Sequence, residues 1–237
     1  MKFRAALIAL SILCLGISSA TADLIHHYKF DTDASDSAGS ANGTLLFGAS
    51  VSGGTLNLDG LDDYVQFNSY LVPGSGNYSV AMFAKWTGGS VHLSEMISQG
   101  YTGGPGFFMG ADGSGKIRVT DGWLNTGVNY PTDGAFHHFA LTVDAGAAKS
   151  YLYLDGTLAA TLNSALTTTQ STTFTRLGRQ FQTWSEFYHG SLDDVRVYNN
   201  TLSAGDVANL AGVPEPGSIL LVGTAGLVGL IRFRRRS

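Results

Sequence analysis

Asp-Gly dipeptides between short apolar segments constrain the fold of this chain more than any other feature. The dipeptide occurs five times in 237 residues, at 59–60, 112–113, 121–122, 133–134 and 155–156. Asp-Gly favours the type I′ turn, which needs positive φ at both central residues and joins neighbouring antiparallel strands. The clearest example is Asp155-Gly156, which follows Tyr-Leu-Tyr-Leu and precedes Thr-Leu. We therefore expect a chain built from antiparallel hairpins.

Strands are expected where apolar residues alternate with polar ones between turn residues. Phe139, Leu141 and Val143 share one face in this way, as do Val195 and Val197. Residues 78–86 are apolar on both faces, which is typical of a central strand in a stack of two sheets. The expected strands are 24–30, 55–58, 63–67, 77–86, 105–111, 116–121, 136–144, 150–154, 157–162, 174–178 and 190–198.

These short, closely spaced strands predict an all-β fold, a two-sheet antiparallel β sandwich. No long helical period precedes residue 203. There, Ser203 is suited to cap one short helix that runs through Val207 to Leu210, with Asp206 in its first turn. The 31 glycines follow no strict period, which excludes collagen, and 11% aromatic residues argue against disorder.

Seven segments between residues 28 and 203 form a connected pattern. They are Tyr-Lys-Phe-Asp at 28–31, Asp-Ser-Ala-Gly at 36–39, Leu-Asp-Gly-Leu-Asp-Asp-Tyr-Val at 58–65, and the stretches 78–86, 136–144, 151–156 and 190–199, the last leading into Leu202-Ser203. In this order they resemble the LamG-like jelly-roll domain of the concanavalin A-like lectin/glucanase superfamily. The resemblance spans nearly all of residues 23–211 and implies a concanavalin A-like jelly roll.

The N-terminus has the pattern of a secretory signal peptide. Lys2 and Arg4 precede an apolar run over residues 5–17, and Ala-Thr-Ala at 20–22 forms a small-x-small cleavage site. We expect residues 1–22 to be removed by cleavage after Ala22. The single cysteine, Cys14, lies inside this run, so the mature chain has no disulfide.

The C-terminus combines three features in sequence. Pro214-Glu215-Pro216 is followed by apolar and small residues over 217–231 and then by an arginine cluster. This order resembles the PEP-CTERM sorting signal of Gram-negative bacteria, here residues 212–237 with a transmembrane helix. The resemblance implies cleavage near Pro-Glu-Pro by an exosortase-type protease and transient anchoring in the inner membrane. A plain C-terminal anchor is the alternative. The mature protein is expected outside the cell or on its surface.

The net charge of the mature body limits the classes of molecule that it can bind. Residues 23–213 contain 8 lysines and arginines against 17 aspartates and glutamates, a net charge of −9. Such a body repels polyanions, so we expect no nucleic-acid partner. Neutral glycans or divalent cations fit this charge better.

The residues of a catalytic site are missing from the sequence. A glycosidase needs two carboxyl groups that flank the scissile bond, whereas the only glutamates of the body, Glu95 and Glu186, are far apart and neither has a close carboxylate on its strand. Adjacent histidines, as at 26–27 and 137–138, point to opposite faces of a strand and do not form a metal site. We expect a protein that is not an enzyme.

Aromatic residues in expected loops offer the most plausible binding site, because sugar rings stack on exposed aromatic rings. The candidate carbohydrate-binding residues are Trp123, Trp184 and Tyr188. The alternative is that such rings cap the open ends of the core. Two functions remain open. One is a carbohydrate- or matrix-binding module linked to exopolysaccharide or biofilm. The other is a structural or protein-adhesion domain with no small ligand.

The superfamily resemblance also implies one structural Ca²⁺. In relatives, an aspartate of the last strand and residues near the first strand bind calcium, which points here to Asp193, to Asp31 and to the backbone around residues 39–43. Calcium binds readily to such mixtures of carboxylate and carbonyl oxygens. Alternatively, Asp193 and Asp194 cap turns or pair with neighbours such as Arg196.

Overall fold

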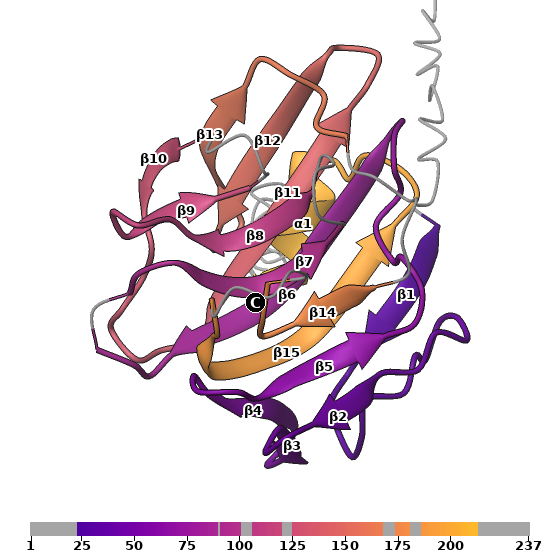
Figure 1. Cartoon of the computed structure of the whole chain (residues 1–237). Helices are drawn as coiled ribbons and strands as arrows, with labels where there is room; N and C mark the ends of the chain where they lie inside the picture. Colours follow the sequence, from indigo (N-terminus) through magenta and orange to yellow (C-terminus); the bar gives the residue numbers. More distant parts are fainter. Residues whose placement is uncertain are drawn as a thin grey trace, which may run out of the picture.

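The computed structural model describes residues 23–89, 91–100, 106–119, 125–167, 174–180 and 186–212. In this part of the chain two antiparallel sheets stack face to face, and one short helix lies outside one of them (Figure 1). The predicted all-β sandwich is thereby confirmed. Residues 1–22 and 213–237, including Ala22, Pro214, Glu215 and Pro216, lie outside the described residues.

Sheet A has eight strands in the order β13-β12-β11-β6-β15-β4-β3, with β1 paired to β15 beside β4. Its strands are β1 (Leu24–Tyr28), β3 (Ser50–Ser52), β4 (Thr55–Asp59), β6 (Tyr78–Trp86), β11 (His137–Asp144), β12 (Lys149–Leu154), β13 (Thr157–Leu162) and β15 (His189–Tyr198). The two long strands β6 and β15 lie side by side at its centre (Figure 1).

Sheet B has seven strands in the order β10-β9-β8-β7-β14-β5-β2. Its strands are β2 (Thr44–Leu46), β5 (Tyr64–Phe67), β7 (Ser94–Gln99), β8 (Phe107–Ala111), β9 (Lys116–Arg118), β10 (Asn125–Asn129) and β14 (Thr175–Leu177). The prediction from sequence missed β2, β3, β7 and β10. Three of these are edge strands, and β7 is polar along most of its length although all six of its residues are buried.

The Asp155-Gly156 hairpin has the predicted geometry. Asp155 and Gly156 have φ values of 50° and 75°, so both central residues adopt the left-handed region that a type I′ turn requires. The other Asp-Gly pairs of the described residues differ. At Asp112-Gly113 the aspartate side chain instead accepts hydrogen bonds from Ser114 N and Lys116 N, at 2.8 and 2.9 Å. Asp-Gly therefore marks turns here without fixing one turn type.

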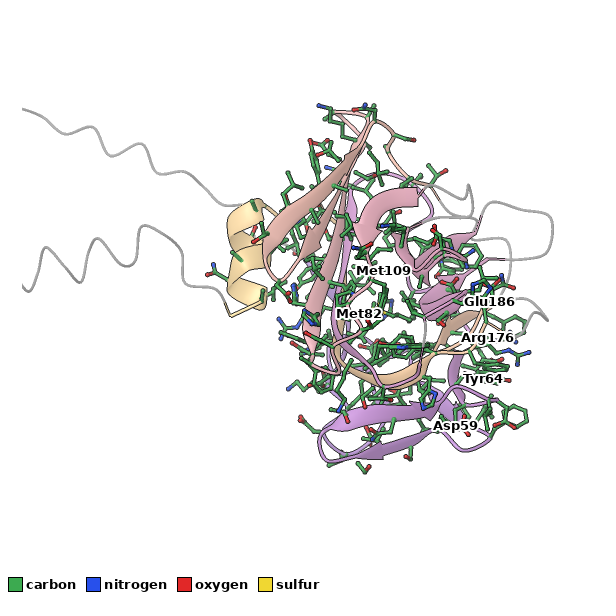
Figure 2. All side chains as sticks on the ribbon, turned by 90° about the vertical axis from the view of Figure 1, so that its left-hand side faces the viewer. Asp59, Tyr64, Met82, Met109, Arg176 and Glu186 are labelled. Atoms are coloured by element: carbon green, nitrogen blue, oxygen red, sulfur yellow. The ribbon has the colours of Figure 1, made fainter. Side chains whose placement is uncertain are left out.

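The main core fills the space between the two sheets. Its largest fully buried side chains include Phe67, Met96 and Phe139, contributed by strands of both sheets. Figure 2 places Met82 of β6 and Met109 of β8 in this interior layer. The inner faces of the two sheets thus form one continuous apolar layer, as sandwich folds require.

A second, smaller apolar cluster lies on the outer face of sheet A. The helix α1 (Ala204–Leu210) covers it with Val207, and Leu24 and Leu210 pack at its border. Ser203 and Asp206 form a capping box at the start of α1, which confirms the predicted helix start. The start of β1 and the end of α1 thus both lie at the border of this cluster on sheet A. Among the described residues, no helix is long and apolar enough to cross a membrane.

The outer face of sheet A also buries a histidine. His138 is 3% exposed, packs edge-on against Phe83 at 5.0 Å between ring centroids, and has a buried Nδ1 atom without a hydrogen-bond partner. Burial is the main cause that lowers its pKa from 6.5 to about 4. The imidazole is therefore neutral in the folded protein at neutral pH.

This histidine makes stability depend on pH. The unfolded chain binds the proton near pH 6.5 and the folded protein only near pH 4, so the contribution is intact above pH 6.5 and is lost as the pH falls to 4. The loss should approach roughly 3 kcal/mol. Urea unfolding across this range should show a smaller loss of stability in His138→Gln than in the native chain. The matched change at an exposed histidine, His92→Gln, should leave the loss unchanged; identical curves for all three proteins would contradict this account.

Candidate functional site

The outer face of sheet B carries the polar and aromatic side chains that the core excludes. In β5, Val65 and Phe67 point into the core, so Tyr64 and Gln66 point outward. In β14, Leu177 lies in the core and Arg176 between it and Thr175 points outward. Figure 2 shows Glu186, Arg176 and Tyr64 one below another on the side of the molecule away from α1.

Glu95, Arg118 and Glu186 form an ion bridge on this face. The guanidinium of Arg118 in β9 contacts the carboxylate of Glu95 in β7 and lies 2.6 Å from that of Glu186. Glu95 is 0%, Arg118 3% and Glu186 9% exposed. Arg118 also stacks over the ring of Phe108 at 4.6 Å. Two glutamates that are distant in the sequence therefore meet at one buried arginine.

The ion bridge does not have the geometry of a glycosidase site. In such an enzyme the scissile bond lies between the two carboxyl groups. Here the Arg118 guanidinium lies between Glu95 and Glu186 and contacts both. The arrangement is suited to hold strands and a loop together rather than to transfer a proton to a sugar.

Beside the ion bridge lies a row of rings and guanidinium groups, which we call the arginine–aromatic row: Phe47, Tyr64, Phe174, Arg176, Arg179 and Phe187. The guanidinium of Arg176 lies 5.2 Å from the centroid of Tyr64 and 5.6 Å from that of Phe174. Arg179 lies 4.9 Å from Tyr64 and 4.9 Å from Phe187. Cation–π contacts of this length are attractive, so the row is a preformed surface.

Two rings of the row are exposed to solvent. Phe47 is 72% and Phe174 36% exposed, and Phe47 lies 5.6 Å from the ring of Tyr64. Phe47 has a φ of 60°, a conformation that costs energy for a bulky residue. The buried carboxylate of Asp63 holds this turn by accepting hydrogen bonds from Gly48 N at 2.6 Å and from Asp59 N at 3.0 Å.

The loop after β14 is anchored to the face at both of its described ends. Arg176 donates a hydrogen bond to the Gln180 carbonyl oxygen at 3.1 Å, and Ser98 donates one to the Arg179 carbonyl oxygen at 2.7 Å. At the far end, Glu186 contacts Arg118. These bonds position Arg179 and Phe187 over the sheet.

The predicted carbohydrate-binding residues have different outcomes. Trp123 and Trp184 lie outside the described residues. The prediction for Tyr188 is wrong, because this ring is 0% exposed and belongs to the main core. Its hydroxyl group forms a buried hydrogen bond with that of Tyr130 at 2.9 Å, and burial raises its pKa. A phenol with its polar atom satisfied inside the core is unavailable to a sugar.

Asp31 and Asp193 line one cavity of about 280 Å³ on the outer face of sheet A. The cavity is completed by the side chains of His27, Lys29, Phe83, Asp194 and Arg196. Burial, followed by the charges of Asp194 and Asp31, raises the pKa of Asp193. Asp194 is already bonded to Arg196 at 2.8 Å and to His27 at 2.5 Å. The two aspartates named from the sequence thus share one environment.

The backbone of residues 39–43 does not line this cavity, contrary to the expectation from sequence. Asp36 instead organises that segment. Its carboxylate accepts hydrogen bonds from Gly39 N at 2.9 Å and Ala41 N at 3.2 Å, and contacts His26 Nδ1 at 2.6 Å. The segment is therefore directed toward Asp36.

Lectin-type jelly-roll sandwiches are the class that this fold defines. The chain belongs to the concanavalin A-like lectin/glucanases superfamily, whose family model matches residues 58–208. This confirms the resemblance to LamG-like domains. A search of curated proteins found no match to the chain.

Several solved structures share the fold. Domain 4 of AbnA, a GH43 extracellular arabinanase from Geobacillus stearothermophilus in complex with arabinotriose, is 24% identical with a TM-score of 0.64, over 80% of this chain and 98% of that one. A Trypanosoma rangeli sialidase is 13% identical, with a TM-score of 0.59, over 80% of this chain and 32% of its own. The binding domain of botulinum neurotoxin DC in complex with SialylT is 11% identical, with a TM-score of 0.59, over 80% and 51%. The chain spans about a third to a half of the last two.

Most of the arginine–aromatic row was not predicted from the sequence. The alternation in the expected strand 63–67 was sufficient to place Tyr64 outward, opposite Val65 and Phe67. Nothing local indicated that Arg176 and Arg179 meet at this ring, because β14 and β5 are over 100 residues apart in the chain. The ion bridge was not predicted either, because its three residues come from β7, β9 and the loop after β14.

Among the polar contacts of sheet B, the ion bridge should contribute most to the free energy of unfolding. Arg118→Met leaves two buried carboxylates without their cation and should destabilise the fold by about 3–5 kcal/mol. Arg196→Met is a matched control, because its pair with Asp194 is about a quarter exposed and should contribute at most about 1 kcal/mol. Urea unfolding of both variants measures the difference; equal, small losses would show that the ion bridge contributes little.

Proposed function

We propose that this chain is an exported, non-catalytic glycan-binding module whose binding surface is the outer face of sheet B. The observation that carries the proposal is the arginine–aromatic row, with Phe47 and Phe174 exposed beside fixed guanidinium groups. Exposed rings next to convergent polar groups are the ordinary composition of a sugar site. The superfamily membership supports the same function.

The related structures support a glycan as the partner. The arabinanase domain was solved with arabinotriose and the toxin binding domain with SialylT. Arg118 between Glu95 and Glu186 supports a binding role without hydrolysis. The extracellular partner is thus a glycan, in our proposal one connected with exopolysaccharide or biofilm.

The placement of the chain ends supports presentation at a cell surface. Asn199 N donates a hydrogen bond to the Asp23 carbonyl oxygen at 3.1 Å, and Leu24 and Leu210 border the same cluster on sheet A. Figure 2 shows α1 on the opposite side from Tyr64 and Arg176. We propose export by the signal peptide of a Gram-negative bacterium, transient inner-membrane anchoring and exosortase processing. A body tethered through α1 would direct the outer face of sheet B away from the membrane.

A structural or protein-adhesion domain is the alternative function. The exposed apolar side chains of Phe47 and Leu61, at 72% and 74% exposure, would also serve a protein contact. The two functions differ in which substitutions would abolish binding of the partner. A glycan site depends on a few rings with polar neighbours, whereas a protein interface covers a larger area.

A glycan array probed with residues 23–213 should identify bound glycans. Replacing Phe47 and Phe174 together by Ala should lower the affinity for those glycans about tenfold per ring, because each ring loses an apolar contact. The matched control is Phe136→Ala, since Phe136 is 38% exposed but packs under Lys85 of sheet A.

Loss of binding in the double variant, with Phe136→Ala unchanged, supports the proposed surface. An array without any bound glycan would refute the function. Unchanged binding in the double variant would place the site elsewhere on the molecule.

We further propose that the cavity of Asp31 and Asp193 holds one structural Ca²⁺. Two observations support this proposal: the carboxylates of Asp31 and Asp193 share the cavity with the cations Lys29 and Arg196, and, after burial, the charges of Asp194 and Asp31 raise the pKa of Asp193. A cation would relieve this repulsion. When bound, the ion would join the segment after β1 to β15. It would stabilise the folded domain and take no part in catalysis.

Calcium should then raise the melting temperature. At a concentration a hundredfold above its dissociation constant, linkage gives about 2.7 kcal/mol of added stability. Melting residues 23–213 in calcium and then in chelator measures the shift, and Asp193→Asn should abolish it, whereas Asp144→Asn, on an outer turn, should not. An unchanged melting temperature in calcium would show that the cavity of Asp31 and Asp193 holds no structural Ca²⁺.

A further inference from the structure

The arginine–aromatic row holds two cations against one ring. We propose that the outer face of sheet B selects glycans that carry carboxylate groups, such as chains that contain uronic acids, and that Arg179 recognises the carboxylate. This inference rests on the proposed glycan-binding function and specifies the class of its ligand.

The two guanidinium groups are close to each other. Both lie against Tyr64, Arg176 at 5.2 Å and Arg179 at 4.9 Å from its centroid. Burial, and then the charge of Arg179, lowers the pKa of Arg176. Two like charges held in this way repel each other, and an anion bound between or beside them removes that cost.

The carboxylates of the same face are occupied elsewhere. Glu95 and Glu186 both contact Arg118. Within the described ranges no carboxylate forms an ion pair with Arg179, and its buried Nε atom has no hydrogen-bond partner. The ion bridge and the row together contain three arginines and two glutamates, a net charge of +1 for these groups within a body of charge −9. The neighbouring carboxylate, that of Asp63, accepts hydrogen bonds from Gly48 N and Asp59 N at the Phe47 turn.

The chemistry of the row matches a carboxylated sugar. A guanidinium group presents a planar pair of N–H donors that fits the two oxygens of a carboxylate. Phe174, 5.6 Å from Arg176, is exposed and offers a face on which the pyranose ring can stack. The negative charges elsewhere on the body act over longer distances and are screened beyond about 8 Å at physiological salt.

The test compares carboxylated polymers with their own neutral forms. The probes are polygalacturonate, alginate and hyaluronan, each beside its carboxyl-reduced product, and dextran sulfate, titrated into the full chain in mild detergent. We expect at least one carboxylated polymer to bind about tenfold or more tightly than its reduced form, since hydrogen bonds to charged groups are the strong ones. The preference should weaken as salt is added.

The variants assign this preference to Arg179. Arg179→Gln should remove it while the fold melts as before, and Arg179→Lys, which keeps the charge without the planar donors, should retain only part of it. Arg196→Gln, on the outer face of sheet A, should leave it intact. If Arg179→Gln does not fold, the reduced preference of Arg179→Lys carries the test.

The outcomes separate this inference from the proposed function. Equal binding of carboxylated and reduced polymers, full preference in the Arg179 variants, or equal binding of dextran sulfate would overturn carboxylate selection and leave glycan binding in place. If no polymer binds and the glycan array is also empty, the glycan-binding function itself fails.

Discussion

The buried ion bridge of Glu95, Arg118 and Glu186 is the interaction on which sheet B depends. Glu95 lies in a strand whose six residues are all buried, and a buried carboxylate is stable only with a cation beside it. Arg118 supplies that cation from β9 and also contacts Glu186 at the end of the loop after β14. One guanidinium thereby joins two strands and a loop.

The position of the arginine–aromatic row follows from this contact. Glu186 fixes one end of the loop, and the hydrogen bonds to the carbonyl oxygens of Arg179 and Gln180 fix the other. Arg179 is consequently held over the ring of Tyr64 and also lies over the ring of Phe187. The buried ion bridge thus pre-organises the arginine–aromatic row. Less conformational entropy is then lost when a ligand binds.

The two outer faces of the sandwich differ in what covers them. On sheet A the helix α1, Leu24 and Leu210 cover an apolar cluster, and both ends of the described chain lie there. On sheet B, Phe47 and Phe174 are exposed, and Tyr64 and Arg176 point the same way (Figure 2). In our proposal, attachment and recognition are therefore separated across the thickness of the molecule.

Local patterns predicted the fold well and the site poorly. Alternation identified strands such as β11 and β15, and Ser203 with Asp206 marked the start of α1, because these signals act between near neighbours. The polar strand β7 was missed because its burial depends on Arg118, which is distant in the sequence. Tyr188 was misassigned because the sequence does not show that Tyr130 satisfies its hydroxyl group inside the core. Asp31 and Asp193 line one cavity because β1 pairs with β15, and their role as calcium ligands stays a prediction.

The central claim is that the outer face of sheet B is the recognition surface, and mapping amide chemical shifts by NMR during a glycan titration tests it most directly. Our account predicts that the backbone signals of Tyr64, Arg176 and Arg179 shift in proportion to bound glycan, while those of Asp193 and Arg196 on sheet A stay in place. Shifts confined to sheet A, or to the strand edges away from β5 and β14, would contradict it.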